Sequence, residues 1–306
     1  MRKKAIYIFF LFFLLGIVAH FSLKGYNYHL EIKRKQQELE KQRAAWAILE
    51  KEIEKECGGF NGEATIVIKN LNKGWQILIN QHELFPSASL VKVPIMAACF
   101  YAANDGKIRL EDTLRLKASH VVGGLGPLKN MPVGAEFTVR KLIELMISES
   151  DNTATNVLID YLGFDYLNSS FEKLGLKDTN ISRKIMDLRS RDRGIENFTS
   201  ASDLTYLFEE IYNERLINKA YSQMCLEFLR KQKINDRIPA KLPGYVAAAH
   251  KTGLERGICH DAGIVFTPQG NFLICVLVKH PDKTAALPKK FIAQIAFLTY
   301  EYYRSL

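Results

Sequence analysis

The sequence lacks the short motifs that mark several common classes of enzyme and binding protein. It contains no His-Glu-x-x-His and no Cys-x-x-Cys, and its seven histidines are scattered, so we expect neither a metal site nor a cofactor. It contains no Gly-x-Ser-x-Gly, which argues against the nucleophile elbow of α/β-hydrolases. No stripe of basic and aromatic residues occurs, so nucleic-acid binding is not expected.

Cysteine is scarce, with five residues in a chain of 306. An odd number of cysteines leaves at least one thiol unpaired if the protein is exported. Cys99 and Cys275 stand in apolar runs, which predicts that they are small core residues.

Acidic residues are missing from the N-terminus. Residues 1–25 carry four basic residues and no acid, so the net charge of +9 leaves +9 − 4 = +5 for the rest of the chain. Residues 5–23 hold no charge and are long enough to cross a bilayer as a helix. The basic flank predicts an N-terminus inside the cell and a domain outside it. Ile17-Val18-Ala19 is a poor cleavage site, which favours an uncleaved signal anchor over a cleaved, secreted or periplasmic form.

Three segments follow from composition and periodicity. We expect an N-terminal anchor or signal segment over 1–25, a charged helical stalk over 26–44 and one folded domain over 45–306. Within the domain, alternating apolar residues predict a hairpin over 64–80, and three further strands are expected between 245 and 279. Helical patterns dominate from 87 to about 200, continue over 203–216 and 220–231, and return over 289–304.

This order predicts an α+β fold with three α/β/α layers. Strands from both ends of the domain would form one antiparallel sheet with flanking helices, and residues 87–200 would form an all-helical subdomain. The site is expected between these two parts.

A lone lysine, Lys92, interrupts the apolar run SASLVKVPIMAACF. Ser89 lies three residues earlier, one helical turn away on the same face. A desolvated lysine beside a hydroxyl can act as the base that activates a nucleophile. The same spacing recurs by chance at Ser170 and Lys173, so it carries little weight alone.

Two further motifs follow in the chain, each with a simpler interpretation. Ser150-Asp151-Asn152 falls at a break between two helical patterns, where Asn152 could serve only as a helix cap. Lys251-Thr252-Gly253 ends the apolar stretch YVAAAH, where the lysine could simply be solvated. A cation, a hydroxyl and a glycine side by side would also suit a carboxylate receptor on a sheet edge.

The three motifs occur in the order and the contexts of one family. SASLVKVPIM, MISESDNTATNVLIDYLG, HKTG and HDAGIVFTP resemble the penicillin-recognising serine hydrolases from about residue 45 to the C-terminus, especially class A β-lactamases.

The resemblance implies a role for each motif residue. Ser89 would be the nucleophile, Lys92 its base and Ser150 the proton relay to the leaving nitrogen. Asn152 would hold the substrate amide, and Lys251, Thr252 and Gly253 would receive the substrate carboxylate. The backbone N–H groups of Ser89 and Leu254 would form the oxyanion hole.

One departure concerns deacylation. The family's Glu-x-x-Leu-Asn pattern is absent, and aligning Arg183 with the family's arginine places Ile185 where the glutamate should stand. Asp187 and Glu196 are acids nearby that could replace it.

Three hypotheses remain open: a membrane-anchored β-lactamase, a D,D-peptidase acting on peptidoglycan stem peptides, and a penicillin sensor. The ligand would be a β-lactam or a D-Ala-D-Ala-type peptide, and we expect a monomer.

Overall fold

The computed structural model describes residues 2–306, without the side chains at 2–6, 8–10 and 12. It divides into two compact units, one ending at Lys51 that also contains Leu306, and a larger one formed by residues 52–305. The first helix, α1 (Arg2–Gly58), is continuous and ends at Gly58, where the glycine pair predicts a stop. Among the described residues, no helix has the length and apolar content needed to cross a bilayer. Several side chains of the predicted anchor over 5–23 lie outside the described part of the structure.

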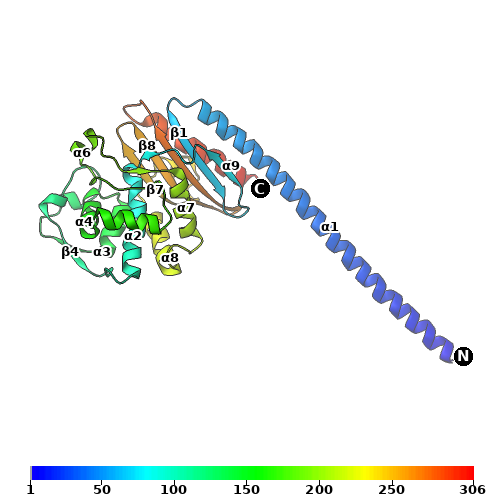
Figure 1. The fold of residues 1–306 in the computed structure, drawn as a ribbon. Helices are drawn as coiled ribbons and strands as arrows, with labels where there is room; N and C mark the ends of the chain where they lie inside the picture. Colours follow the sequence, from blue (N-terminus) through cyan, green and yellow to red (C-terminus); the bar gives the residue numbers. More distant parts are fainter. Residues whose placement is uncertain (1) are drawn as a thin grey trace. The chain divides into compact units, whose positions relative to one another are not determined.

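A five-stranded antiparallel sheet forms the centre of the larger unit (Figure 1). The strand order is β2-β1-β9-β8-β7. The bounds are β1 Glu63–Asn70, β2 Gln76–Ile79, β7 Ala247–Glu255, β8 Ile258–Thr267 and β9 Gly270–Lys279. Edge strand β2 comes from the N-terminal part of the unit and edge strand β7 from its C-terminal part, as predicted. The predicted hairpin is confirmed by the antiparallel pairing of β1 with β2.

Helices cover both faces of this sheet, because side chains alternate between them along each strand. On β9, Phe272 stacks on Tyr303 of α9 (Ala286–Arg304), with ring centroids 5.1 Å apart. The alternate residues Leu273, Cys275 and Leu277 belong to the core on the other face. There α7 (Ala201–Tyr212) packs on β8 and β9, and α8 (Lys219–Arg230) packs on β7. The three predicted layers are therefore present.

The segment from 87 to 200 is mostly helical, as predicted. Its α-helices are α2 (Lys92–Asn104), α3 (Val139–Ser148), α4 (Asn152–Leu162), α5 (Phe164–Lys173) and α6 (Leu188–Asp192). Short 3₁₀ segments are η1 (Ala88–Val91), η2 (Ala118–His120) and η3 (Leu128–Asn130), with η4 (Ile238–Lys241) later in the chain.

This subdomain is not wholly helical. β4 (Thr113–Arg115) pairs with β5 (Glu136–Thr138) inside it, and β3 (Phe85–Pro86) pairs with β6 (Phe198–Thr199) at its two ends. Strands of two or three residues are too short to leave a periodic signal in the sequence.

Capping residues fix where several helices begin. Thr138 accepts a hydrogen bond from the N–H of Lys141 at the start of α3, and Ser200 accepts one from Asp203 N–H at the start of α7. Such side-chain oxygens satisfy backbone donors that have no partner inside the helix.

All five cysteines are free thiols. Cys99, Cys225, Cys259 and Cys275 are buried, whereas Cys57, in the last turn of α1, is half-buried. Burial raises the pKa of each of these thiols.

Candidate active site

Ser89 lies in η1, directly before the central helix α2. The preceding residue, Ala88, has a left-handed φ of 45°, which turns the chain sharply out of β3. Lys92 is the first residue of α2, and every residue from there to Phe100 is buried. The apolar run that surrounds Lys92 in the sequence is therefore the signature of a helix buried on all sides, and the lysine itself is 0% exposed.

Two buried lysines from distant parts of the chain meet at Ser150. Lys92 Nζ donates to the Ser150 carbonyl at 2.8 Å and to Ser150 Oγ at 3.2 Å, and Lys251 Nζ donates to the same Oγ at 2.9 Å. Lys92 Nζ also donates to Asn152 Oδ1 at 2.8 Å. We call Lys92, Ser150, Asn152 and Lys251 the Ser150 cluster. It joins α2, the α3–α4 turn and β7.

Burial alters the acidity of both lysines. It lowers the pKa of Lys92 to about 7, although the negative charge of Asp151 acts in the opposite direction. Burial also lowers the pKa of Lys251 well below its usual value, and the nearby Lys92 charge lowers it further. Near neutral pH, Lys92 therefore exists partly as the free amine, which can accept a proton.

In the α3–α4 turn, one residue caps the helix and its neighbour contributes to the candidate site. Asp151, not Asn152, caps α4: its carboxylate accepts from Ala154 N–H at 2.7 Å and from Leu128 N–H at 2.8 Å. The side chain of Asn152 is thus free to bind Lys92 through Oδ1, while Nδ2 donates to Gly123 O at 3.1 Å. The simpler interpretation of Asn152 as the cap is wrong.

Ser150 is held in an unusual backbone conformation. Its φ of 54° is left-handed, which is uncommon for a residue other than glycine. The chain passes close by at Gly126 (φ 99°), where an added Cβ would lie 2.2 Å from the Asp151 carboxylate. Only glycine fits there, and this packing helps to fix the turn that presents Ser150.

The Lys251-Thr252-Gly253 motif lies inside β7 and not at its end. The strand continues to Glu255, and Lys251 and Thr252 are buried, so the solvated-lysine interpretation is wrong. A Cβ added to Gly253 would lie 3.4 Å from that of Ala88. β7 therefore lies against η1 at this point, so the two predicted oxyanion donors, Ser89 and Leu254, come from neighbouring elements. The Ser89 N–H is in the first turn of η1, where backbone donors lack an acceptor in the helix.

The second Ser-x-x-Lys match has an ordinary structural role. Ser170 Oγ donates to the Tyr166 carbonyl within α5 at 2.7 Å, and Lys173 Nζ lies 5.8 Å from the centre of the Tyr101 ring. Neither residue has a hydrogen bond or ion pair to the Ser150 cluster among the described residues.

Ile185 is held in place by Asn156 of α4. Asn156 Oδ1 accepts from Ile185 N–H at 2.9 Å, and its Nδ2 donates to Ile185 O at 3.1 Å. The Ile185 side chain is 8% exposed and belongs to the apolar core. The position that the alignment assigns to a glutamate therefore carries a buried apolar side chain on a firmly anchored backbone.

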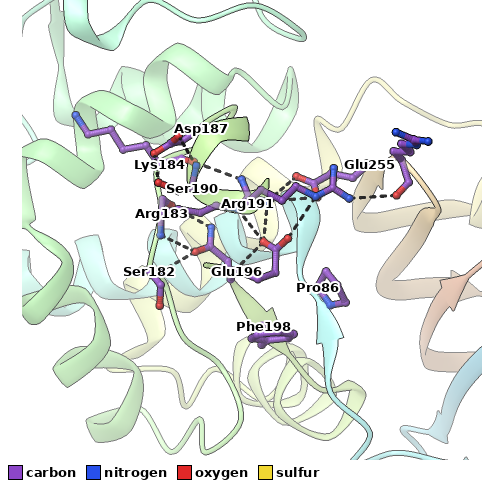
Figure 2. Close-up of polar contacts among 12 residues, drawn as sticks. Pro86, Ser182, Arg183, Lys184, Asp187, Ser190, Arg191, Glu196, Phe198 and Glu255 are labelled. Atoms are coloured by element: carbon purple, nitrogen blue, oxygen red, sulfur yellow. Dashed lines mark hydrogen bonds and ion pairs between the residues drawn. The ribbon is translucent and has the colours of Figure 1, made fainter. Parts of the chain in front are cut away.

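The two acids proposed as replacements are engaged elsewhere (Figure 2). Asp187 caps α6, accepting from Ser190 N–H at 3.1 Å and Ser190 Oγ at 2.7 Å, and these hydrogen bonds lower its pKa. Glu196 lies 2.7 Å from Arg183 Nη2 and accepts from Asn197 N–H at 2.8 Å. Within the described residues, no hydrogen bond or ion pair joins either carboxylate to Ser89 or the Ser150 cluster.

The loop formed by residues 182–197 is also attached to the end of β7 (Figure 2). Arg183 is buried, and its Nη2 donates to Glu255 Oε1 at 3.0 Å. Arg191 Nε lies 3.7 Å from Glu255 Oε2, and Arg191 Nη2 donates to the Arg256 carbonyl at 3.2 Å. Glu255 comes directly after Leu254, so these contacts link the loop to the strand that carries the predicted oxyanion donor.

Sequence reasoning did not identify Asn156 or Glu255. A buried asparagine inside an apolar helix was the available signal for Asn156, since such a side chain must find partners. Glu255 gave no signal, because its partners lie 72 and 64 residues away in the chain. No group of three or more potential metal-ligating side chains occurs within the described part of the chain.

Comparison with known proteins places this geometry in a family. Residues 48–303 match the profile of the Beta-lactamase enzyme family. Beta-lactamase VEB-1 of Pseudomonas aeruginosa is 25% identical over 269 residues, which cover 82% of this chain and 89% of that protein.

Solved structures show the same fold. PBP-A is 29% identical with a TM-score of 0.78, covering 84% of this chain and 96% of that one. A leucine-to-glutamate variant of PBP-A, described as an acyl-enzyme complex with penicillin G, aligns equally well, with a TM-score of 0.78 and 29% identity over 85% of this chain and 97% of that one. A β-lactamase from Sphaerobacter thermophilus is 29% identical with a TM-score of 0.76, covering 86% and 98%. With its three motifs, its fold and a profile match over most of its length, this chain belongs to the β-lactamase enzyme family.

Proposed function

We propose that the protein is a serine hydrolase that opens β-lactam rings through an acyl-enzyme on Ser89. One observation carries the proposal: two fully buried lysines donate hydrogen bonds to the single hydroxyl of Ser150. Burying ammonium groups is costly, and a fold that only needed stability would gain little from it. Lysines whose pKa is strongly lowered in this way are typical of catalytic sites.

The proposed acylation uses the free amine of Lys92. In the protonated state, all three hydrogens of Nζ have acceptors: Ser150 O, Ser150 Oγ and Asn152 Oδ1. Loss of one proton leaves a lone pair that can accept the Ser89 proton. Ser89 Oγ then bonds to the lactam carbonyl carbon, the C–N bond breaks, and the proton passes through Ser150 Oγ to the leaving nitrogen. Atoms and charge balance without any other reactant.

The remaining motif residues would bind the substrate. The N–H groups of Ser89 and Leu254, which belong to the neighbouring elements η1 and β7, would stabilise the oxyanion. Lys251 and Thr252 would receive the lactam carboxylate, whose negative charge favours the protonated form of Lys251. Asn152 Nδ2 has a second hydrogen beyond the one given to Gly123 O, and this hydrogen could hold the substrate amide.

A D,D-peptidase is the second candidate, and Ile185 favours it. An isoleucine cannot activate water, and the nearby acids Asp187 and Glu196 are engaged in other contacts. An acyl-enzyme formed with a β-lactam would then persist, as it does when a penicillin inhibits a peptidase. A penicillin sensor would share this long-lived adduct but would not cleave peptides.

Intact-protein mass spectrometry of the full chain mixed with benzylpenicillin tests these alternatives. A penicilloyl adduct that forms and then disappears while the drug is consumed supports the β-lactamase. A persistent adduct supports the peptidase or the sensor, and release of D-alanine from a D-Ala-D-Ala peptide separates those two. Ser89→Ala should abolish the adduct, whereas Ser170→Ala should not; an adduct that survives Ser89→Ala would overturn the assignment.

The proposal includes attachment to the membrane outside the cytoplasm through residues 5–23. This rests on the uncharged sequence and its basic flank, and large apolar side chains such as Leu14 and Phe21 are exposed on α1. Carbonate extraction of membranes tests it: an anchored protein stays in the pellet with its N-terminus intact. Recovery of a shortened, soluble form would indicate a cleaved signal peptide. Light scattering in detergent would test the expected monomer.

A further inference from the structure

A cavity of about 580 Å³ lies beside α9, the helix that covers the face of the sheet opposite to α7 and α8. Its walls come from the end of α1 and the chain that follows it, from the β9–α9 connection and from α9 itself. The part of α1 that lines it belongs to the same compact unit as the sheet. Among the described residues, neither Ser89 nor any member of the Ser150 cluster lines the cavity. Cavities of this size hold small organic ligands, so it is a candidate for a second site.

One part of the cavity is aromatic and apolar. The rings of Phe60 and Phe291 stack with their centroids 4.3 Å apart and an angle of 25° between their planes. Leu287 lies one turn before Phe291 on the same face of α9, and 64% of its surface is exposed. Covering this apolar surface with the body of a ligand is favourable, and an aromatic body would extend the stack.

Three lysines, Lys55, Lys241 and Lys290, line the polar part of the cavity. Lys241 Nζ donates a hydrogen bond to the neutral amide oxygen Oε1 of Gln294 at 2.5 Å. Lys55 and Lys290 are exposed, and neither side chain has a hydrogen bond or an ion pair among the described residues. None of the three ammonium groups is therefore paired with a carboxylate in the described part of the chain.

Two carboxylates line the same cavity, and one of them is already engaged. Asp282 accepts hydrogen bonds from Leu287 N–H at 2.9 Å and from Thr284 Oγ1 at 2.8 Å, and these bonds lower its pKa to about 2. Glu56 accepts no hydrogen bond among the described residues. Three cations therefore share the cavity with one carboxylate that has no partner, and this excess of positive charge favours an anionic ligand.

His280 adds a hydrogen-bonding group that lacks a partner. It lines the cavity and is 8% exposed, and neither ring nitrogen has a hydrogen-bond partner within the described residues. A neutral imidazole carries one N–H donor, and a buried donor without an acceptor is rare in folded proteins. The backbone N–H of His280 donates to Gly257 O at 2.9 Å, which holds the chain in place at this residue. A carboxylate in the cavity would give the ring N–H an ionised acceptor.

We propose that this cavity is a second ligand site, which binds a small aromatic carboxylate. The carboxylate would bind His280 and Lys290, and the aromatic ring would pack on Phe60 and Phe291. The inference goes beyond the proposed function and does not depend on it, because none of these residues takes part in the chemistry at Ser89. Since the end of α1 and α9 both contribute to the walls, a bound ligand would stabilise the contact between them.

Isothermal titration calorimetry of the full chain with 2-naphthoate tests the site, and 2-naphthamide is the uncharged probe of similar shape. We expect naphthoate to bind about tenfold more tightly than the amide, because it accepts charge-assisted hydrogen bonds. Lys290→Gln should weaken naphthoate binding about threefold, and Glu56→Gln, which removes a repelling carboxylate, should strengthen it about threefold. Lys73→Gln removes an exposed cation from the β1–β2 turn and should leave the affinity unchanged.

Two results of the titration would overturn the proposal. The first is equal affinity for the acid and the amide. The second is the reverse pattern, in which Lys290→Gln strengthens binding and Glu56→Gln weakens it, because that pattern belongs to a cation site.

NMR spectroscopy establishes where naphthoate binds, since a carboxylate also suits the proposed receptor at Lys251 and Thr252. We expect naphthoate to shift the signals of the Gly59 backbone and the Gln294 side-chain amide, both of which line the cavity. His280→Leu should weaken binding about tenfold while those shifts persist at higher concentration. Shifts confined to Gly253 and its neighbours, or an affinity that His280→Leu leaves unchanged, would overturn the second site. Failure of benzylpenicillin to acylate the protein would overturn the proposed function alone.

Discussion

The Ser150 cluster and the 182–197 loop are both rich in polar contacts, but those contacts serve different ends. In the cluster, groups from α2, the α3–α4 turn and β7 converge on one hydroxyl. Burial lowers the pKa of both lysines, so a smaller fraction of each is protonated than is usual for lysine. In the loop, the polar groups pair with one another and with β7, and the residue aligned with the family's glutamate is apolar. One region is arranged for proton transfer and the other for support, so formation and hydrolysis of an acyl-enzyme need not occur together in this fold.

The largest effect should come from removing the shared hydroxyl of the cluster. Ser150→Ala deprives both lysines of a common acceptor and interrupts the proposed proton path to the leaving nitrogen, so acylation by benzylpenicillin should slow about a thousandfold. Stopped-flow acylation rates give the measurement. Ser148→Ala is the matched control, because that hydroxyl donates to Glu144 O within α3 and has no hydrogen bond to the Ser150 cluster among the described residues. Similar rates for both variants would mean that Ser150 is not the relay.

Placing a carboxylate in the 182–197 loop should give the loop a part in hydrolysis of the acyl-enzyme, which it otherwise lacks. Asn156 fixes the backbone at residue 185, so Ile185→Glu would place an acid where the family's glutamate is expected. We expect loss of the penicilloyl adduct to accelerate about a hundredfold. Ile185→Gln, which has the same shape without a base, should not change the adduct lifetime. Equal lifetimes in the two variants would show that a missing carboxylate is not what limits hydrolysis.

The altered acidity of the cluster should appear in the pH dependence of acylation. With a Lys92 pKa of about 7, the free amine decreases tenfold per pH unit below that value, so acylation should slow by about tenfold per unit as the pH falls below 7. Above pH 7 the rate should level off, because the free amine is then the main form of Lys92. A rate that is constant from pH 5 to pH 8 would exclude Lys92 as the base.

The smallest effect concerns the ion pairs that attach the 182–197 loop to β7. Glu255→Gln removes one of the two carboxylates bound by Arg183 and leaves Glu196 in place, so we expect a loss of about 1 kcal/mol in the free energy of unfolding. That corresponds to a fall of roughly 3 °C in melting temperature. Glu136 forms an exposed ion pair with Arg115, so Glu136→Gln should lower the melting temperature less. A larger fall for Glu136→Gln would contradict the assigned role of Glu255.

The sequence predicted the sheet and the principal helices because their apolar periodicity is long and regular. Strands β8 and β9 extend over ten residues each, whereas β3 to β6 have two or three. The apolar stretch YVAAAH predicts the first part of β7, but it stops at the Lys251-Thr252-Gly253 motif, whereas the strand continues to Glu255.

The candidate site was predicted as a set of residues but not as an arrangement. The motifs identified Ser89, Lys92, Ser150 and Lys251, yet nothing in their spacing indicated that both lysines would donate to one serine. Asp151 and Asn152 are both common caps, and only their backbone geometry determines which of them does the capping. Contacts between residues far apart in the chain, such as Arg183 with Glu255, have no local pattern.

The free thiols have a practical consequence for experiments. Since the structure contains no disulfide among its five cysteines, its fold does not depend on oxidative pairing, and refolding in the presence of a reducing agent should be as efficient as without it. Four thiols are buried and should resist alkylation, while Cys57 is the most accessible. A maleimide dye should therefore attach chiefly at the end of α1, which offers a native position for a fluorescent reporter that requires no engineered cysteine.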